Sequence, residues 1–120
     1  MFTLYIKRRF LMFAKTTDFS EKQQRLAMFG KVLSHPARIA IIEFLSKQQG
    51  CIVGDIAKEF PFLSRTTVSQ HLQELKNMGI IQGEIQGVTI CYCLNPTVLS
   101  EINELFTQLF TDVLSTNCQC

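Results

Sequence analysis

A three-residue turn between two helix signals constrains the fold of this chain more than any other feature. Pro61 ends a short helix predicted over residues 51–60, because the residue before a proline is pushed out of the helical conformation. Ser64 then caps a further helix that runs to about Met78, where Gly79 is the stop signal. A turn this short predicts two closely crossing helices, as in a helix-turn-helix unit.

The helix that begins after Ser64 has two chemically different faces. At about 100° per residue, one side collects apolar side chains and the other collects neutral polar ones. The apolar set is Val68, Leu72, Leu75 and Met78, and the polar set is Thr66, Gln70, Gln73 and Asn77. We therefore expect one face to pack on the core and the other to be available to a partner.

Two more helices are expected upstream. The first begins near Ser20 and stops before Ser34. Ser34 is expected to cap the second, because a serine followed closely by Pro36 supplies a hydrogen-bond acceptor and a preset φ. Apolar residues at helical spacing carry this second helix to Gln49-Gly50.

A β-hairpin is expected directly after the motif. Residues 80–84 and 88–94 form short β-rich runs around a turn at residues 85–87, in which Gly87 supplies the conformational freedom. Helix, turn, capped helix and hairpin follow one another in the order of a winged helix-turn-helix. The expected fold is therefore mainly α with a small β-hairpin (α+β).

The last predicted helix begins at Asn95-Pro96 and runs to Leu114. Its apolar residues cover about 180° of the helix circumference, whereas the apolar stripe of a typical surface helix covers about 100°. Such a helix requires burial both in its own core and against a second subunit, so we expect a homodimer. The expected interface residues are Leu26, Phe29, Leu99, Phe106, Phe110 and Leu114.

The 120-residue chain has the length of one domain. We divide it into residues 1–19 as an N-terminal extension or arm, 20–114 as the winged helix-turn-helix domain with terminal dimerisation helices, and 115–120 as a cysteine-containing tail. The formal net charge of +2 permits a nucleic-acid partner without proving one, so the argument for DNA depends on the motif.

The expected location is the cytoplasm. Lys7, Arg8 and Arg9 interrupt the apolar start of the chain, which does not fit a secretory signal. No apolar run approaches the ~18 residues that a membrane span needs. Five cysteines in a reducing compartment point to metal or redox chemistry more than to structural disulfides.

Three segments resemble the ArsR/SmtB family of metal-responsive repressors, and the similarity covers residues 21–114. They are Leu-Ser-His-Pro-Ala-Arg at 33–38, Thr-Val-Ser-Gln-His-Leu at 67–72 and Leu-Lys-Asn-Met-Gly-Ile-Ile at 75–81. The resemblance implies that the helix after Ser64 enters the major groove of double-stranded DNA. The DNA-facing residues that it implies are Arg65, Thr66, Thr67, Ser69 and Gln70.

Other positions depart from that family. The hairpin carries Glu84 where related repressors often have arginine, so phosphate contacts are expected from Arg38, Lys58, Arg65 and Lys76 or from the N-terminal arm. His71 borders the apolar face and is expected to be a half-buried packing residue. The third helix lacks the family's arsenic-binding Cys-Val-Cys motif, and Cys51 is interpreted as a small apolar residue at a helix start.

Related repressors bind zinc through Asp and His on the last helix, but this helix contains no histidine. The candidate metal ligands are therefore the thiols of Cys91, Cys93, Cys118 and Cys120. Residues two apart on a strand point to the same face, so the first pair presents both sulfurs on one side and Tyr92 on the other. Thiolates suit soft ions: As(III) or Sb(III) with three sulfurs, or Zn(II) or Cd(II) with four. The last helix would be about 28 Å long, which favours a site that two subunits share.

These features predict a repressor that binds operator DNA when metal-free and dissociates when As(III) or Sb(III) binds the thiolates. A Zn(II)- or Cd(II)-sensing repressor and a thiol-disulfide redox sensor are the alternatives on the same fold, and a winged protein-binding adaptor is a further one. An enzyme is not expected, because no histidine, carboxylate cluster or phosphate loop accompanies the thiols. Neither an organic cofactor nor a membrane partner is expected.

Overall fold

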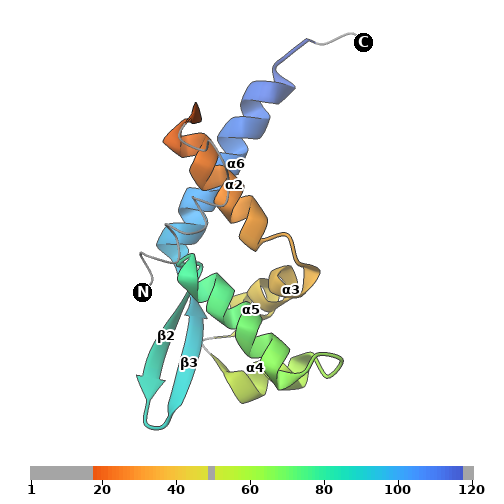
Figure 1. Ribbon diagram of the computed structural model, residues 1–120, viewed down its shortest axis with the longest axis vertical. Helices are drawn as coiled ribbons and strands as arrows, with labels where there is room; N and C mark the ends of the chain where they lie inside the picture. Colours follow the sequence, from red (N-terminus) through yellow and green to blue (C-terminus); the bar gives the residue numbers. More distant parts are fainter. Residues whose placement is uncertain (1–17, 49–50, 118–120) are drawn as a thin grey trace.

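The computed structural model describes residues 18–48 and 51–117, and its helices and strands are labelled as in Figure 1. In chain order they are α2 (Glu21–Val32), α3 (Pro36–Ser46), β1 (Cys51–Ile52), α4 (Val53–Glu59), α5 (Arg65–Asn77), β2 (Ile81–Gln86), β3 (Thr89–Leu94) and α6 (Pro96–Leu114). The expected fold, mainly α with a small hairpin, is confirmed. Within the described ranges, no helix has the length and apolar character needed to cross a bilayer.

The ends of three helices are those that the sequence predicts. Ser20 caps α2 and Ser64 caps α5, each by accepting a hydrogen bond from a backbone N–H of the first turn. Asn95 caps α6 in the same way, with Pro96 at its first position. Gly79 follows α5 with a φ of 77°, a left-handed conformation that favours glycine.

The start and the end of α3 differ from the prediction. His35, not Ser34, is the N-cap residue, and its side chain makes no capping hydrogen bond. The Ser34 hydroxyl instead donates to the carbonyl of Lys31 at 2.6 Å, where the last turn of α2 leaves carbonyls without helical donors. The helix ends at Ser46, short of the predicted end at residues 49–50, which lie outside the described part of the chain.

The third predicted helix also begins later than residue 51, where it was expected to start. Cys51 and Ile52 form a strand that pairs antiparallel with β3, and α4 begins only at Val53. The sheet order is β1-β3-β2, so the strand after the hairpin turn is bonded on both sides. A β-branched residue beside a free strand edge gains ladder hydrogen bonds there, which outweighs a weak helical preference.

The turn of the hairpin is tighter than predicted. Ile85 pairs with Ile90 and Gln86 with Thr89, so two of the three residues expected in the turn belong to the strand. Gly87, with a φ of 64°, and Val88 make the connection. In Figure 1 the hairpin projects from one end of the molecule and the second half of α6 from the other.

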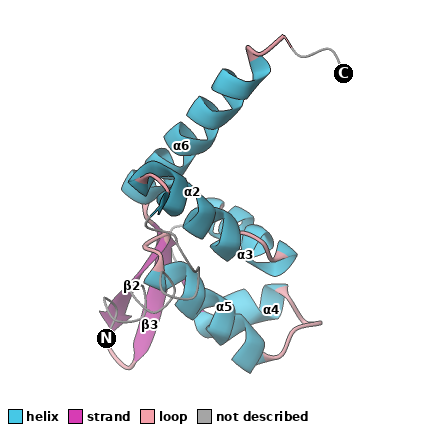
Figure 2. Cartoon of the chain, turned by 45° about the horizontal axis from the view of Figure 1, so that its top comes forward, coloured by secondary structure: helices cyan, strands magenta, loops and turns pink. Residues whose placement is uncertain are grey.

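The core lies among α2, α3, α4, α5, the sheet and the first half of α6, and Figure 2 shows α3, α4 and α5 to one side of the hairpin. The predicted apolar face of α5 is confirmed, because Val68, Leu72 and Leu75 are fully buried. Phe29 on α2 is also fully buried in this core, where it offers no surface to a second subunit. Its assignment to the dimer interface is therefore corrected.

Candidate functional site

The side of α5 that faces away from the core exposes the side chains predicted to contact DNA. Arg65, Thr66, Ser69 and Gln70 are all exposed. Thr67 is half-buried, and its hydroxyl accepts a hydrogen bond from Ser64 Oγ at 2.8 Å. Thr67 therefore belongs to the helix cap as well as to the edge of this face.

The start of α5 favours an anionic partner. Its first turn contains no acidic residue, and helix N-termini carry partial positive charge on N–H groups without helical acceptors. Gly54 on α4 lies beneath the Arg65 side chain, since a Cβ built at Gly54 would lie 3.7 Å from Arg65 Nη2. The guanidinium therefore extends along the junction of α4 and α5.

The tip of the hairpin is apolar. Ile85 is 82% exposed, and Val88 in the turn is also fully open to solvent. Glu84 is the charged residue of the two strands and is exposed. The sequence-based expectation of a charge-poor wing therefore agrees with the side chains that the hairpin presents.

Arg38 does not lie where a phosphate contact was expected. Its side chain is buried, with 8% of its surface exposed. Its Nη1 donates to the carbonyl of Val32 at 3.0 Å, and its Nε donates to Nδ1 of His71 at 3.1 Å. The prediction of a DNA contact was wrong because the guanidinium is held between α2 and α5.

His71 is half-buried on α5, as predicted. Burial lowers the pKa of its imidazole, and the nearby positive charges of Arg38 and His35 lower it further, whereas Glu74 acts in the opposite direction. The His35 and His71 rings are 5.6 Å apart between centroids. The neutral form of His71 is therefore favoured at neutral pH.

Cys91 and Cys93 lie on β3 as half-buried thiols that form no disulfide. The strand alternation is the predicted one: Tyr92 between them is buried, with 7% of its surface exposed, on the opposite side of the sheet. In the ladder, Cys91 pairs with Glu84 of β2 and with Ile52 of β1, which places all three on one face.

The predicted partners of this pair, Cys118 and Cys120, lie outside the described residues. In the part that is described, no group of three or more His, Cys, Asp and Glu side chains is placed to hold a metal ion. The β3 thiols alone would supply two ligands, so a three- or four-sulfur site would need further ligands from elsewhere.

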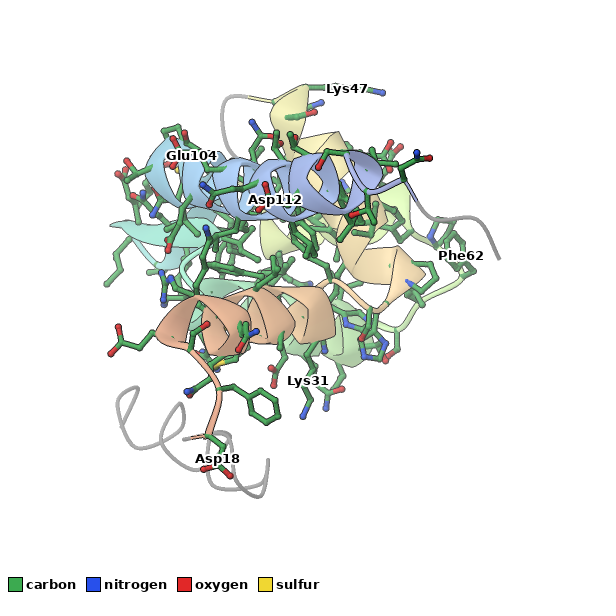
Figure 3. The ribbon with its side chains drawn as sticks, turned by 90° about the horizontal axis from the view of Figure 1, so that it is seen from above. Asp18, Lys31, Lys47, Phe62, Glu104 and Asp112 are labelled. Carbon is green, nitrogen blue, oxygen red and sulfur yellow. The ribbon has the colours of Figure 1, made fainter. Side chains whose placement is uncertain are left out.

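The second half of α6 presents an uncovered apolar surface, made of Leu109, Phe110, Val113 and Leu114. Phe110 also stacks on Phe106 of the preceding turn, with centroids 6.2 Å apart. The first half of α6 is held against α2 by an ion pair between Arg25 and Glu101. Figure 3 shows α6, with Glu104 and Asp112, beside α2, with Lys31.

Comparisons with known proteins agree with this architecture. Residues 35–82 match the family model described as bacterial regulatory protein, arsR family. The transcriptional repressor SdpR of Bacillus subtilis is 38% identical over 71 residues, which cover 59% of this chain and 77% of the relative.

The chain belongs to the ArsR family.

An arsenical resistance operon repressor of Staphylococcus xylosus is 30% identical to this ArsR-family chain over 100 residues, which cover 81% of the chain and 89% of the relative. Among solved structures, the homodimeric winged helix-turn-helix DNA-binding domain of a Mycobacterium bovis protein matches with a TM-score of 0.60 at 23% identity. That match covers 82% of this chain and 88% of the other. At 23% identity, this structural similarity supports the fold alone.

The family assignment makes the protein a DNA-binding transcriptional regulator and not an enzyme. Sequence reasoning missed two features of the site, the strand β1 beside the thiols and the contact of Arg38 with His71. Ile52-Val53, a β-branched pair, was the available signal for the first. Local sequence carries no signal for the second, because its partners are 33 residues apart.

Proposed function

We propose that this protein is a homodimeric repressor that binds operator DNA when metal-free and dissociates when As(III) or Sb(III) binds its cysteine thiolates. The observation that carries the proposal is the presence, on one small fold, of an exposed, acid-poor start of α5 and a pair of free thiols on β3. The first supplies a DNA contact and the second supplies soft ligands.

The proposed DNA contacts are Arg65, Thr66, Thr67, Ser69 and Gln70. Hydroxyl and amide groups at a helix N-terminus bind phosphates and the edges of bases in the major groove. Lys58 and Lys76 are exposed on α4 and α5 and are available for phosphates. The apolar hairpin tip adds no cation, so the expected salt dependence of binding comes from α4, α5 and the arm at residues 1–19.

Dimerisation is proposed through α6. Leu114 is 81% exposed and Phe110 is more than half exposed in the single chain, which is costly for large apolar side chains on one helix face. Leu26, Leu99 and Phe106, which are also assigned to the interface, are half-buried in the single chain. The related M. bovis domain is homodimeric, which supports the same assembly here.

The inducer site is proposed to join Cys91 and Cys93 of one subunit to Cys118, Cys120 or both of its partner. The 19 residues of α6 span about 28 Å at 1.5 Å per residue, and this helix lies between the two thiol pairs in the sequence, which favours a site shared by two subunits. Antiparallel α6 helices across a two-fold axis would bring the tail of one subunit to the hairpin of the other. The S. xylosus relative represses an arsenical resistance operon, which supports a metalloid as inducer.

The test is operator binding measured by fluorescence anisotropy, with a duplex selected by the purified protein from random-sequence DNA. Arsenite, antimonite, zinc, cadmium and peroxide are titrated in turn under matched thiol conditions. Release by arsenite that needs three thiols supports the proposal, whereas release by zinc or cadmium that needs four indicates a tetrahedral site. Release by peroxide that a dithiol reverses indicates a redox switch.

Mixed dimers test the shared site. One subunit carries Cys91→Ser and Cys93→Ser, and the other carries Cys118→Ser and Cys120→Ser. In the shared arrangement such a dimer keeps one intact site of two, because one pair of complementary halves is wild type. Loss of both sites contradicts the arrangement, because sites within one chain would each lack one thiol pair, and retention of both sites contradicts it as well. Failure of wild-type protein to select any DNA contradicts the repressor proposal.

A further inference from the structure

We propose that Arg38 is a positioning residue for operator recognition, which holds α5 against the end of α2 through neutral His71, and that protonation of His71 releases α5 and weakens operator binding. This inference rests on the proposed function, because it assumes that α5 contacts the operator. It assigns a role to a side chain that the DNA-contacting face does not use.

One end of the link is the last turn of α2. Val32 is the final residue of that helix, and its carbonyl is among those that have no helical donor. Arg38 Nη1 donates to this carbonyl at 3.0 Å. A cation is stabilised there, because a helix C-terminus carries partial negative charge. The buried guanidinium is therefore attached to α2 although it belongs to α3.

The other end of the link is His71 on α5. Arg38 Nε donates to Nδ1 of His71 at 3.1 Å. Because a guanidinium is always protonated and has no acceptor, Nδ1 must carry the lone pair and the imidazole proton must be on Nε2. An imidazolium has two donors and cannot accept this bond. Protonation of His71 therefore breaks the contact and places two cations side by side.

The packing of the molecule explains why this link affects α5. The helix α5 packs most extensively on α4 and α3 and α2 on α6, and buried side chains of α2 and α5 share one core. Arg38 adds directed hydrogen bonds to this apolar packing, because it bonds both to the end of α2 and to the middle of α5. His71 directly follows Gln70 and is two residues from Ser69, both on the exposed face. A change in the position of the His71 side chain therefore moves the neighbouring side chains that are proposed to contact bases.

The charged and titratable groups around His71 define the pH range. Burial disfavours the imidazolium most, and the positive charges of Arg38 on α3 and of His35 at the start of α3 also disfavour it. Glu74 of α5 favours it. Together they lower the pKa of His71 below its ordinary value of 6.5. The link is therefore intact at pH 7.5 and is lost only as the pH falls below 6.5.

The direction of the pH effect separates this inference from simple electrostatics. Added positive charge near DNA strengthens binding by contact with phosphates. If protonation of His71 only added charge, acid would tighten the complex. The loss of a positioning contact predicts the opposite, a weaker complex at lower pH.

The experiment measures operator affinity of the full-length dimer by fluorescence anisotropy between pH 7.5 and 5.5 at constant ionic strength. The probe is the duplex selected from random-sequence DNA at pH 7.5. Wild-type affinity is expected to fall about tenfold, the equivalent of ~1.4 kcal/mol. H71N offers a neutral side-chain oxygen near the position of Nδ1, so it should bind at pH 7.5 within about threefold of wild type and show no acid-dependent loss.

Two further variants complete the test. R38K keeps the charge but cannot make both bonds in the same geometry, so it should bind about tenfold more weakly at pH 7.5 and respond little to acid. H35N removes the neighbouring imidazole and should keep the acid-dependent loss. Circular dichroism on the same samples restricts every comparison to folded protein.

Wild-type binding that is unchanged or tighter at pH 5.5 overturns the inference, and so does an equal loss in H71N. R38K that binds as tightly as wild type also overturns it. Failure of wild-type protein to bind the duplex at pH 7.5 is a different result, because it contradicts the proposed function itself.

Discussion

The cap of α5 at Ser64 allows DNA contact and folding stability to be tested separately, because a cap of the same kind begins α2 at Ser20. The Ser64 hydroxyl accepts from the N–H of Thr67 at 3.1 Å, and the Ser20 hydroxyl accepts from the N–H of Gln23 at 3.1 Å. Loss of either hydroxyl costs about 1 kcal/mol. Ser64→Ala and Ser20→Ala should each lower the melting temperature by about 4 °C.

Aspartate replacements separate the cap from the charge. Aspartate caps a helix about as well as serine, so S64D and S20D should keep the melting temperature. At position 64, however, the added carboxylate lies at the end of α5 that is proposed to approach DNA phosphates. Repulsion of about 1 kcal/mol per subunit at ~4 Å in water amounts to about 2 kcal/mol for a dimer, or a loss of about 30-fold in affinity.

The assays are thermal unfolding at one protein concentration, because the stability of a dimer depends on concentration, and anisotropy with the selected duplex at one salt concentration. S20D is the matched control and should bind like wild type. Equal affinities of S64D and S20D would refute the placement of the α5 N-terminus on DNA. An unchanged melting temperature of S64A would refute the cap.

Three further predictions concern the thiols, α6 and the hairpin. The Cys91→Ser/Cys93→Ser double variant should bind operator like wild type but resist arsenite in the anisotropy titration, and full release by arsenite would contradict the proposed ligands. Phe110→Asp should give monomers in analytical ultracentrifugation and lose operator binding, whereas an intact dimer would exclude this face from the interface. Gly87→Ala meets no atom within 4 Å, so its cost is the left-handed φ of 64°, about 1 kcal/mol in urea unfolding, and unchanged stability would contradict that cost.

The local signals in the sequence were sufficient to predict the helix that carries the proposed DNA-contacting face. Ser64 and Gly79 define the ends of α5 because a side-chain cap and a left-handed residue act within one turn. The same argument failed at Ser34, whose hydroxyl had a competing acceptor in α2. Whether a serine caps the helix after it or closes the helix before it depends on geometry that the sequence does not contain.

Features that depend on distant partners were not predicted. The two-residue strand β1 forms because the free edge of β3 lies beside it. The sequence of residues 51 and 52 gives no indication of that edge. Arginine is usually a surface residue, yet Arg38 is buried, where it bonds to the end of α2 and to His71. The pairing of Cys91 and Cys93 on one face was predictable, because strand alternation is local.

The central position of β3 has a consequence for the timing of an inducer response. A strand that is bonded to β2 on one edge and to β1 on the other opens only when both ladders break, so it belongs to the slowly fluctuating part of the fold. The spacing of Cys91 and Cys93 is therefore fixed before any ion arrives. In the proposed site, the first two bonds to an ion would therefore need little ordering of the protein, and binding of the third ligand would set the rate of the response.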